Sequence, residues 1–115
     1  MKDLTFKREL RLLTPESYKN VFKKNYRVSS PNLIILSRKN NLNYPRLGIT
    51  VAKKQMKRAV DRNRFKRVTR ESFRLNQHQL NHKDYVVIAK FPAKNIKNRE
   101  LFESFDKLWK KLNQH

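Results

Sequence analysis

The sequence predicts an α+β fold, or a compact α/β sandwich, with helices packed around one sheet in the order helix, two or three strands, helix, strand, helix. Three observations support this. The 115 residues are the size of one domain. Short apolar runs of β-forming residues alternate with longer segments in which apolar residues recur every three or four positions. No repeat, low-complexity tract or glycine-serine linker divides the chain. We therefore expect residues 1–115 to form a single domain.

The chain begins with a basic stretch, residues 1–13, which we expect to be an extended segment. The apolar side chains that can anchor it are Phe6, Leu10, Leu12 and Leu13. A first helix should then run from Pro15 to about Lys23, because Thr14 can cap it and Glu16 suits the positive end of its dipole. Its apolar face is formed by Tyr18, Val21 and Phe22.

Three segments have the composition of strands. Residues 33–36 are an apolar run that predicts a strand of about six residues, and Val28 fits a short edge strand before it. Residues 40–45 are turn material, and residues 47–52 form the next strand. The short separation predicts that these two strands pair as an antiparallel hairpin. Gly48, the only glycine, indicates a close backbone approach or a bulge within a strand. Residues 84–89 predict a third strand.

Two more helices complete the expected fold. Residues 57–75 contain no glycine or proline, and Asn76 can end the helix that they predict. We expect its buried face to consist of Val60, Phe65, Val68 and Leu75. A last helix should begin near Asn98. Its core face should consist of Leu101, Phe102, Phe105, Leu108, Trp109 and Leu112.

Composition excludes several classes of protein. The chain has no cysteine, so it has neither a disulfide framework nor a thiolate metal site. It has no apolar run of membrane-spanning length and no secretory signal at its start, which predicts a cytoplasmic protein. With 29 lysines and arginines against 9 acidic residues, the net charge is +20. Such self-repulsion makes most sense when the usual partner is a polyanion, for which nucleic acid is the default.

The strongest motif is the basic segment from Lys53 to Arg74, in which only Asp61 and Glu71 are acidic. Four of its cations repeat every fourth residue and should form one stripe, opposite the buried face: Arg62, Lys66, Arg70 and Arg74. Like charges at this spacing destabilise an isolated helix. A solvated helix face usually mixes both signs, whereas this one is nearly all positive and rich in arginine, which suits phosphate oxygens. The stripe therefore predicts polyanion binding.

Two further patterns can be explained either by a binding role or by an ordinary structural role. Tyr18 and Phe22 lie one helical turn apart, so their rings could stack on unpaired bases or belong to the core. His78 and His82 have a metal-ligand spacing, but no third ligand stands nearby, and we expect exposed loop histidines without a metal. No nucleophile motif or phosphate loop is present, so we expect no catalytic side chains.

Residues 59–67, followed by residues 70–74, resemble the RNR signature of the protein subunit of bacterial ribonuclease P. Residues 12–22, 46–54 and 84–89 resemble the family's first helix, central strand and last strand. The resemblance covers about residues 10 to 112. In one departure, Lys57 and Arg58 stand where many members have Gly-Asn before the helix.

The resemblance implies an α-β-β-β-α-β-α order with a left-handed βαβ crossover. It also implies that the protein binds a catalytic RNA as a 1:1 heterodimer, and that the holoenzyme, an endoribonuclease, removes the 5′ leader of precursor tRNA. The RNA, with a divalent metal such as magnesium, would perform the hydrolysis.

The family's two RNA surfaces can be placed on this sequence. By position, the residues facing the catalytic RNA would be Lys53, Lys54, Arg58, Arg62, Asn63, Arg64 and Arg67, together with Arg74 at the end of the stripe. The residues lining a cleft for the single-stranded leader would be Tyr18, Phe22, Leu36, Lys66 and Arg70.

The main competing hypothesis is a ribosomal or other structural RNA-binding protein. A binder of double-stranded DNA would need base-reading side chains on the basic helix, where only Asn63 is suitable. A membrane-surface helix would need apolar residues that the core requires. A stand-alone nuclease would need a cluster of acidic metal ligands, and the acidic residues here are scattered.

Overall fold

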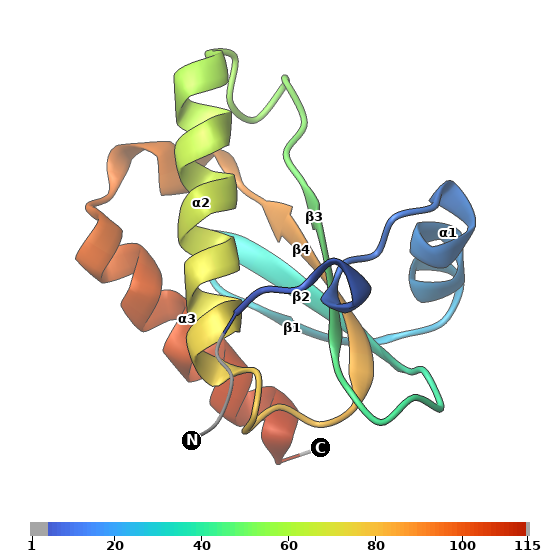
Figure 1. Cartoon of the computed structure of the whole chain (residues 1–115). Coiled ribbons are helices and arrows are strands. Elements are labelled where there is room, and N and C mark those ends of the chain that lie inside the picture. The colour runs from blue at the N-terminus through green and yellow to red at the C-terminus, as the bar shows by residue number, and fades with distance from the viewer. Residues whose placement is uncertain (1–4, 115) are drawn as a thin grey trace.

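A four-stranded sheet lies between two layers of helices, with α1 on one face and α2 and α3 on the other (Figure 1). The computed structural model describes residues 5–114. Its elements are η1 (Arg8–Leu10), α1 (Pro15–Lys23), β1 (Tyr26–Ser29), β2 (Leu33–Lys39), β3 (Arg46–Thr50), α2 (Ala59–Asn76), β4 (Lys83–Ala89), η2 (Phe91–Asn95) and α3 (Asn98–Asn113). The order of helices and strands is therefore the predicted one, in a single compact α+β domain.

The strand pairing differs from the expected hairpin. The order across the sheet is β1-β2-β4-β3, so β4 lies between the two strands that were expected to pair. β4 is antiparallel to β2 and parallel to β3. The physical reason is the apolar content of β4, whose residues 85–87 are fully buried. A strand that is apolar on both faces needs a central position covered by helices on both sides.

The parallel pair β3 and β4 is joined through α2, which makes the βαβ unit that the family resemblance implies. An ion pair fixes the register at its start, where Arg46 Nε and Nη2 donate to the two carboxylate oxygens of Asp84 at 2.8 and 2.7 Å. The hydrogen bond to Asp84 raises the pKa of Arg46. Asn40 Nδ2 also donates to Asp84, at 3.0 Å, and so ties the β2–β3 turn to this pair. The left-handed sense of the crossover stays a prediction.

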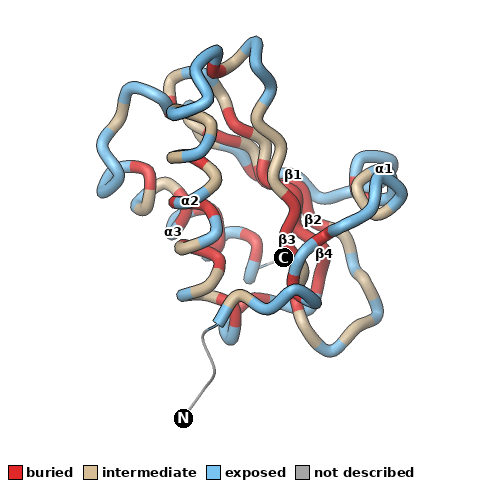
Figure 2. Tube along the Cα trace, turned by 45° about the horizontal axis from the view of Figure 1, so that its top comes forward, coloured by how far each residue is buried: buried red, intermediate tan, exposed pale blue. Residues whose placement is uncertain are grey.

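The main core lies between the sheet and the helices α2 and α3, and Figure 2 shows the buried positions of these elements facing one another. Trp109 is at its centre, edge-on to Phe73 and Tyr85 and stacked on Phe105. Burial raises the pKa of the Tyr85 phenol, which donates to the Asn81 carbonyl at 2.9 Å. The predicted core face of α3 is thus confirmed, with Phe102 only partly buried.

The buried face of α2 is rotated from the expected one. Phe65 and Val68 are buried as predicted, but Val60 and Leu75 are 62% and 49% exposed. Phe73 and the small polar residues Thr69 and Ser72 are buried in their place. The hydroxyls make this possible, because Thr69 donates to the Phe65 carbonyl at 2.7 Å and Ser72 accepts from Trp109 Nε1 at 2.9 Å. Contact with α3 therefore decided which side of α2 faces inward.

The N-terminal segment lies along the β3 edge of the sheet, where Arg11 bridges Leu47. It is not extended throughout, contrary to the sequence prediction, because Arg8–Leu10 form the 3-10 helix η1. Leu12 donates its backbone N–H to the Leu47 carbonyl at 2.9 Å, and Leu10 and Leu12 are buried, as expected of anchors. Leu13 was expected to anchor as well, but it is 53% exposed because it follows the last paired residue. Residues 1–4 lie outside the described part of the chain. Within residues 5–114, no helix is both long and apolar enough to span a membrane.

Candidate RNA-binding surface

The loop between β3 and α2 is held in place by an arginine of the basic stripe. Arg62 Nη1 donates to the carbonyls of Met56 and Lys57, at 3.0 and 2.7 Å. Met56 is fully buried and anchors the loop from below. The turn before it carries Lys53 and Lys54, both exposed. Arg62 is therefore half-buried and positions this loop, whereas the sequence predicted that it would be exposed on the stripe.

The first turn of α2 is closed by an ion pair. Arg58 Nε and Nη2 donate to the Asp61 carboxylate at 2.9 and 3.1 Å. This contact holds the pKa of Asp61 below its ordinary value and raises that of Arg58. The Arg58 side chain is still 74% exposed, so its guanidinium stays open to a further anion.

Arg64 joins α2 to the segment that leads into α3. Its Nε donates to Asn98 Oδ1 at 2.7 Å, Nη1 donates to the Ala93 carbonyl at 3.1 Å, and Nη2 donates to the Ile96 carbonyl. Each guanidinium nitrogen thus has a partner inside the protein. The structure gives Arg64 a structural part that nothing in its sequence neighbourhood indicates, and its contact with RNA stays a prediction.

The remaining cations of α2 differ in their exposure and in whether another residue of the protein binds them. Arg67, Arg70 and the neighbouring Asn63 are exposed, and Lys66 is half-buried. Arg74 is engaged by Glu71, whose pKa this contact lowers, with Nε–Oε2 at 3.1 Å. Among residues 5–114, the cations of this surface without a hydrogen bond to a protein side chain or carbonyl are Lys53, Lys54, Lys57, Lys66, Arg67 and Arg70.

On the opposite face of the sheet, Tyr18 packs over the only glycine. The Tyr18 hydroxyl accepts a hydrogen bond from the Ile49 backbone N–H at 3.2 Å. A Cβ added at Gly48 would lie 2.6 Å from Tyr18 Cε1, so a larger residue fits beneath the ring only if the ring or the strand moves. The close approach expected at Gly48 is therefore confirmed, and Tyr18 is a half-buried ring held at its hydroxyl.

The other residues predicted to line the leader cleft lie in two layers. Phe22 is 47% exposed on α1, whereas Leu36 is 6% exposed and belongs to the small core beneath α1, with Leu12, Val21 and Val86. Lys66 and Arg70 lie on α2, in the layer across the sheet. The structure thus brings Tyr18 and Leu36 together, with Phe22 exposed on the same helix as Tyr18, and places the two cations in a different layer. That these residues bind a leader stays a prediction.

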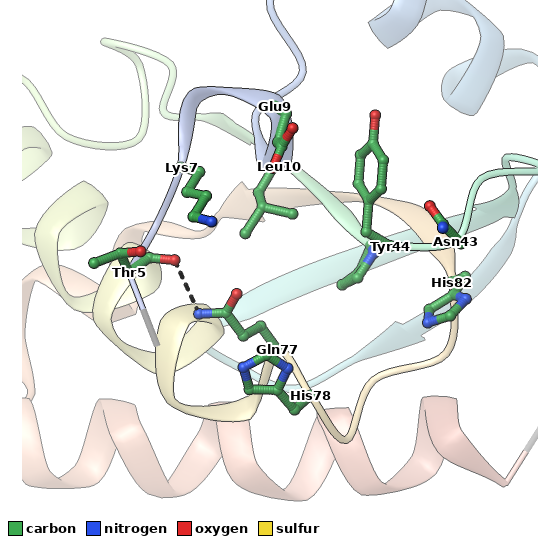
Figure 3. A pocket seen from close by; sticks show the side chains of 10 residues that line it. Thr5, Lys7, Glu9, Leu10, Asn43, Tyr44, Gln77, His78 and His82 are labelled. Atoms are coloured by element: carbon green, nitrogen blue, oxygen red, sulfur yellow. Dashed lines mark hydrogen bonds between the residues drawn. The ribbon is translucent and has the colours of Figure 1, made fainter. Parts of the chain in front are cut away.

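The two helical-spaced histidines lie beyond the end of α2, and both are exposed, as predicted. They line a pocket of about 260 Å³ together with Glu9 (Figure 3). In that pocket, Gln77 Nε2 donates to the Thr5 carbonyl at 3.2 Å. No three histidine, aspartate or glutamate side chains in residues 5–114 lie close enough together to hold a metal ion.

A small α+β domain that presents a basic loop and a basic helix has the charge pattern of a nucleic-acid-binding protein. The family model for Ribonuclease P matches residues 6–113, and the chain belongs to this family. It is 59% identical to the ribonuclease P protein component of Vibrio campbellii, over 99% of this chain and 97% of that one. It is 58% identical to the protein component of Photobacterium profundum, with the same coverage.

Solved structures agree with this assignment. The RNase P protein of Staphylococcus aureus superposes with a TM-score of 0.83 and 30% identity, covering 88% of this chain and 93% of that one. The RNase P protein of Thermotoga maritima superposes with a TM-score of 0.79 and 30% identity, covering 88% and 96%. The function is that of a ribonuclease P protein component, and the competing hypothesis of a separate ribosomal or structural RNA-binding protein is not favoured.

Proposed function

We propose that the chain is the accessory subunit of a ribonuclease P in which an RNA subunit performs the hydrolysis that removes the 5′ leader of precursor tRNA. The observation that carries this proposal is the family match over residues 6–113, with relatives of nearly the same length. The proposal includes a 1:1 complex with the catalytic RNA and a cytoplasmic location.

The basic loop and the exposed cations of α2 support a contact between the protein and the catalytic RNA. The loop carrying Lys53 and Lys54 is held in place by Arg62, and the exposed Arg67 follows on α2. Cations fixed in this way bind backbone phosphates without needing to order a flexible segment. We assign this surface to the catalytic RNA.

The α1 face supports a contact with the leader. Tyr18 is fixed by its bond to Ile49, and Phe22 exposes about half of its surface one turn away. Rings that are fixed and partly exposed can stack on unpaired bases with little dependence on sequence. Of the five residues carried over from the family, we retain Tyr18 and Phe22 as stacking residues.

The acidic side chains near the basic surface are poorly placed to bind the magnesium that we expect the holoenzyme to use. The described acidic residues nearest the basic surface, Asp61 and Glu71, are each engaged by an arginine. We therefore propose that the RNA, rather than this chain, holds the divalent metal of the holoenzyme.

The test of the accessory role is reconstitution. Precursor tRNA is incubated with magnesium and the protein alone, the catalytic RNA alone, or both. We expect no cleavage by the protein alone, and faster 5′ trimming at low magnesium when the protein joins the RNA. Specific trimming by nuclease-free protein would overturn the proposal. Native mass measurement of the complex tests the 1:1 stoichiometry, and cell fractionation tests the location.

The leader contact is tested with Tyr18→Ala. We expect the holoenzyme to bind precursor tRNA about 1–3 kcal/mol more weakly, the cost of losing one stacked ring, with unchanged affinity for mature tRNA. Phe22→Ala serves as the comparison, because its ring is more exposed and its loss should cost less stability. Equal weakening toward every RNA, together with a lower melting temperature, would mean that Tyr18 is only structural.

A further inference from the structure

A second basic hollow lies at the other end of the sheet, where β2 ends and β4 begins. Its volume is about 690 Å³, within the range of about 300–1,000 Å³ that is usual for ligand sites. Four cations line it: Lys24, Arg38, Lys39 and Lys83. None of the described residues that line it is acidic. This hollow is distinct from the basic surface of α2, because the loop carrying Lys53 follows the far end of β3.

The sheet register places two of these cations directly opposite each other. Lys39 of β2 pairs with Lys83 of β4, so both side chains lie on the same face of the antiparallel pair. Like charges in directly opposed positions destabilise a sheet. Lys83 is only 8% exposed, and no described residue offers it an ion pair or a hydrogen bond. The neighbouring carboxylate, Asp84, is already taken by Arg46 and Asn40.

Beside this pair, the hollow contains a polar atom without a partner. Ser37 is 2% exposed, and its Oγ has no hydrogen-bond partner within the described part of the chain. Ser37 lies two residues before Lys39 and therefore on the same face of β2. A buried hydroxyl nearly always has a partner, so an orphan one in a basic hollow indicates a ligand that accepts its proton.

Arg38 also lines the hollow, but its side chain belongs to the opposite face of the strand, so it lies at the rim. Its Nη1 donates to the Asn20 carbonyl at the end of α1, which fixes the guanidinium and leaves its other donors available. A ligand for this hollow must therefore be an anion with several acceptor oxygens. A phosphate group meets both conditions, since its oxygens can accept from a hydroxyl and from two ammonium groups at once.

We propose that the hollow formed by Ser37, Lys39 and Lys83, with Arg38 and Lys24 at its rim, is a phosphate-binding site that takes a backbone phosphate of RNA. The seven residues of β4 separate it from the α2 loop by roughly 20 Å along the strand, so one RNA can reach both only by passing across the molecule. The site adds a third region of RNA contact to the two proposed above, and it rests on its own geometry rather than on that assignment.

The experiment is a titration followed by backbone amide NMR at constant ionic strength. The protein receives inorganic phosphate in one arm and a short single-stranded RNA in the other, with chloride as the balancing anion. We expect saturable shifts at the amides of Ser37, Lys39 and Lys83. Ser37→Ala and Lys39→Met should each weaken phosphate binding by about tenfold or more, as expected when a hydrogen bond to a charged group is lost. Lys107→Met, an exposed lysine of α3, is the matched control and should change nothing.

The outcomes separate the sources of the phosphate. Saturable shifts in the hollow with both ligands, with RNA displacing inorganic phosphate, support the proposal. Saturation by inorganic phosphate without displacement by RNA assigns the site to a free phosphate and overturns the RNA part. Weak shifts spread over all basic residues, equal in Ser37→Ala and wild type, overturn the site altogether. These results do not depend on the cleavage assay, so a failure here is distinct from a failure of the accessory role.

Discussion

At the scale of single residues, a few side chains each have a structural or binding role that their contacts define. Gly48 leaves room for the Tyr18 ring, and Tyr18 in turn satisfies the backbone N–H of Ile49 on β3. Arg62 and Arg67 share a helix and a charge but not a role, because one is bound to carbonyls and the other is exposed.

Gly48→Ala tests the first of these contacts. The added methyl would lie 2.6 Å from the Tyr18 ring, so the ring or the strand must move. We expect a loss of about 1–3 kcal/mol in the free energy of unfolding, the usual cost of overpacking. Urea unfolding measures it. In the double variant with Tyr18→Ala, the effect of Gly48→Ala should shrink. An undiminished effect in the double variant would contradict the steric explanation.

Arg62→Ala and Arg67→Ala separate structure from binding. Arg67→Ala should weaken binding to the catalytic RNA, reduce the slope of log affinity against log salt by about one, and leave the melting temperature unchanged. Arg62→Ala should weaken binding and also cost about 1–2 kcal/mol of stability, because two carbonyls lose their donor. The measurements are thermal unfolding and RNA affinity at several salt concentrations. Equal stability of the two variants would disprove the difference in role.

At the scale of elements, α2 is the part on which the rest depends. It forms the crossover between parallel strands, packs against α3, and is tied at its start by Arg58–Asp61 and along its side by Arg64. The acidic residue in its first turn also suits the positive end of the helix dipole.

Asp61→Asn should give a pH-dependent loss of stability. Folding lowers the pKa of Asp61 below its ordinary value of 3.8, so its carboxylate stabilises the folded state above that pH. The contribution disappears as the pH falls through the lower pKa of the folded state. Wild type should therefore be more stable than Asp61→Asn at neutral pH, and the difference should vanish in acid.

Thermal unfolding at a series of pH values checks this expectation. Glu103→Gln is the matched control, since its pair with Arg99 is exposed at 3.5 Å and should contribute little at any pH. A difference between wild type and Asp61→Asn that did not change with pH would mean that the carboxylate charge is not its source.

At the scale of the whole molecule, a net charge of +20 on 115 residues makes electrostatics dominate association. Cations gather on the α2 surface and in the hollow at the far end of the sheet, and others lie elsewhere on the surface. The acidic residues of α2 and β4 are engaged by arginines. The molecule therefore presents positive potential in more than one direction.

RNA affinity should consequently depend strongly on salt. If about six to ten phosphates are neutralised, the affinity for the catalytic RNA should fall roughly 10³- to 10⁵-fold between about 50 and 200 mM salt, by analogy with duplex DNA. Filter binding or fluorescence anisotropy across that range measures the slope. A flat response would show that neither basic region makes the contact.

The sequence by itself determined the order of the elements and the family. Local signals suffice for this: Thr14 caps α1 through its hydroxyl, with Ser17 N–H donating at 3.2 Å, and the apolar spacing of α3 marks its core face. The basic segment and its RNR signature likewise depend only on neighbouring residues, and they are enough to indicate RNA binding. Gly48 showed that something approaches closely, although not what.

Only the tertiary structure decided which elements meet. Strand order depends on burial over the whole sheet, so proximity in sequence wrongly paired 33–36 with 47–52, whereas β4 lies between them. The inward face of α2 depends on α3, which moved Val60 and Leu75 to the surface. The roles of Arg62 and Arg64, and the opposed Lys39 and Lys83, come from partners distant in the chain or across the sheet. The sequence shows where the charged residues stand, but only the three-dimensional structure shows which of them are neutralised by a partner.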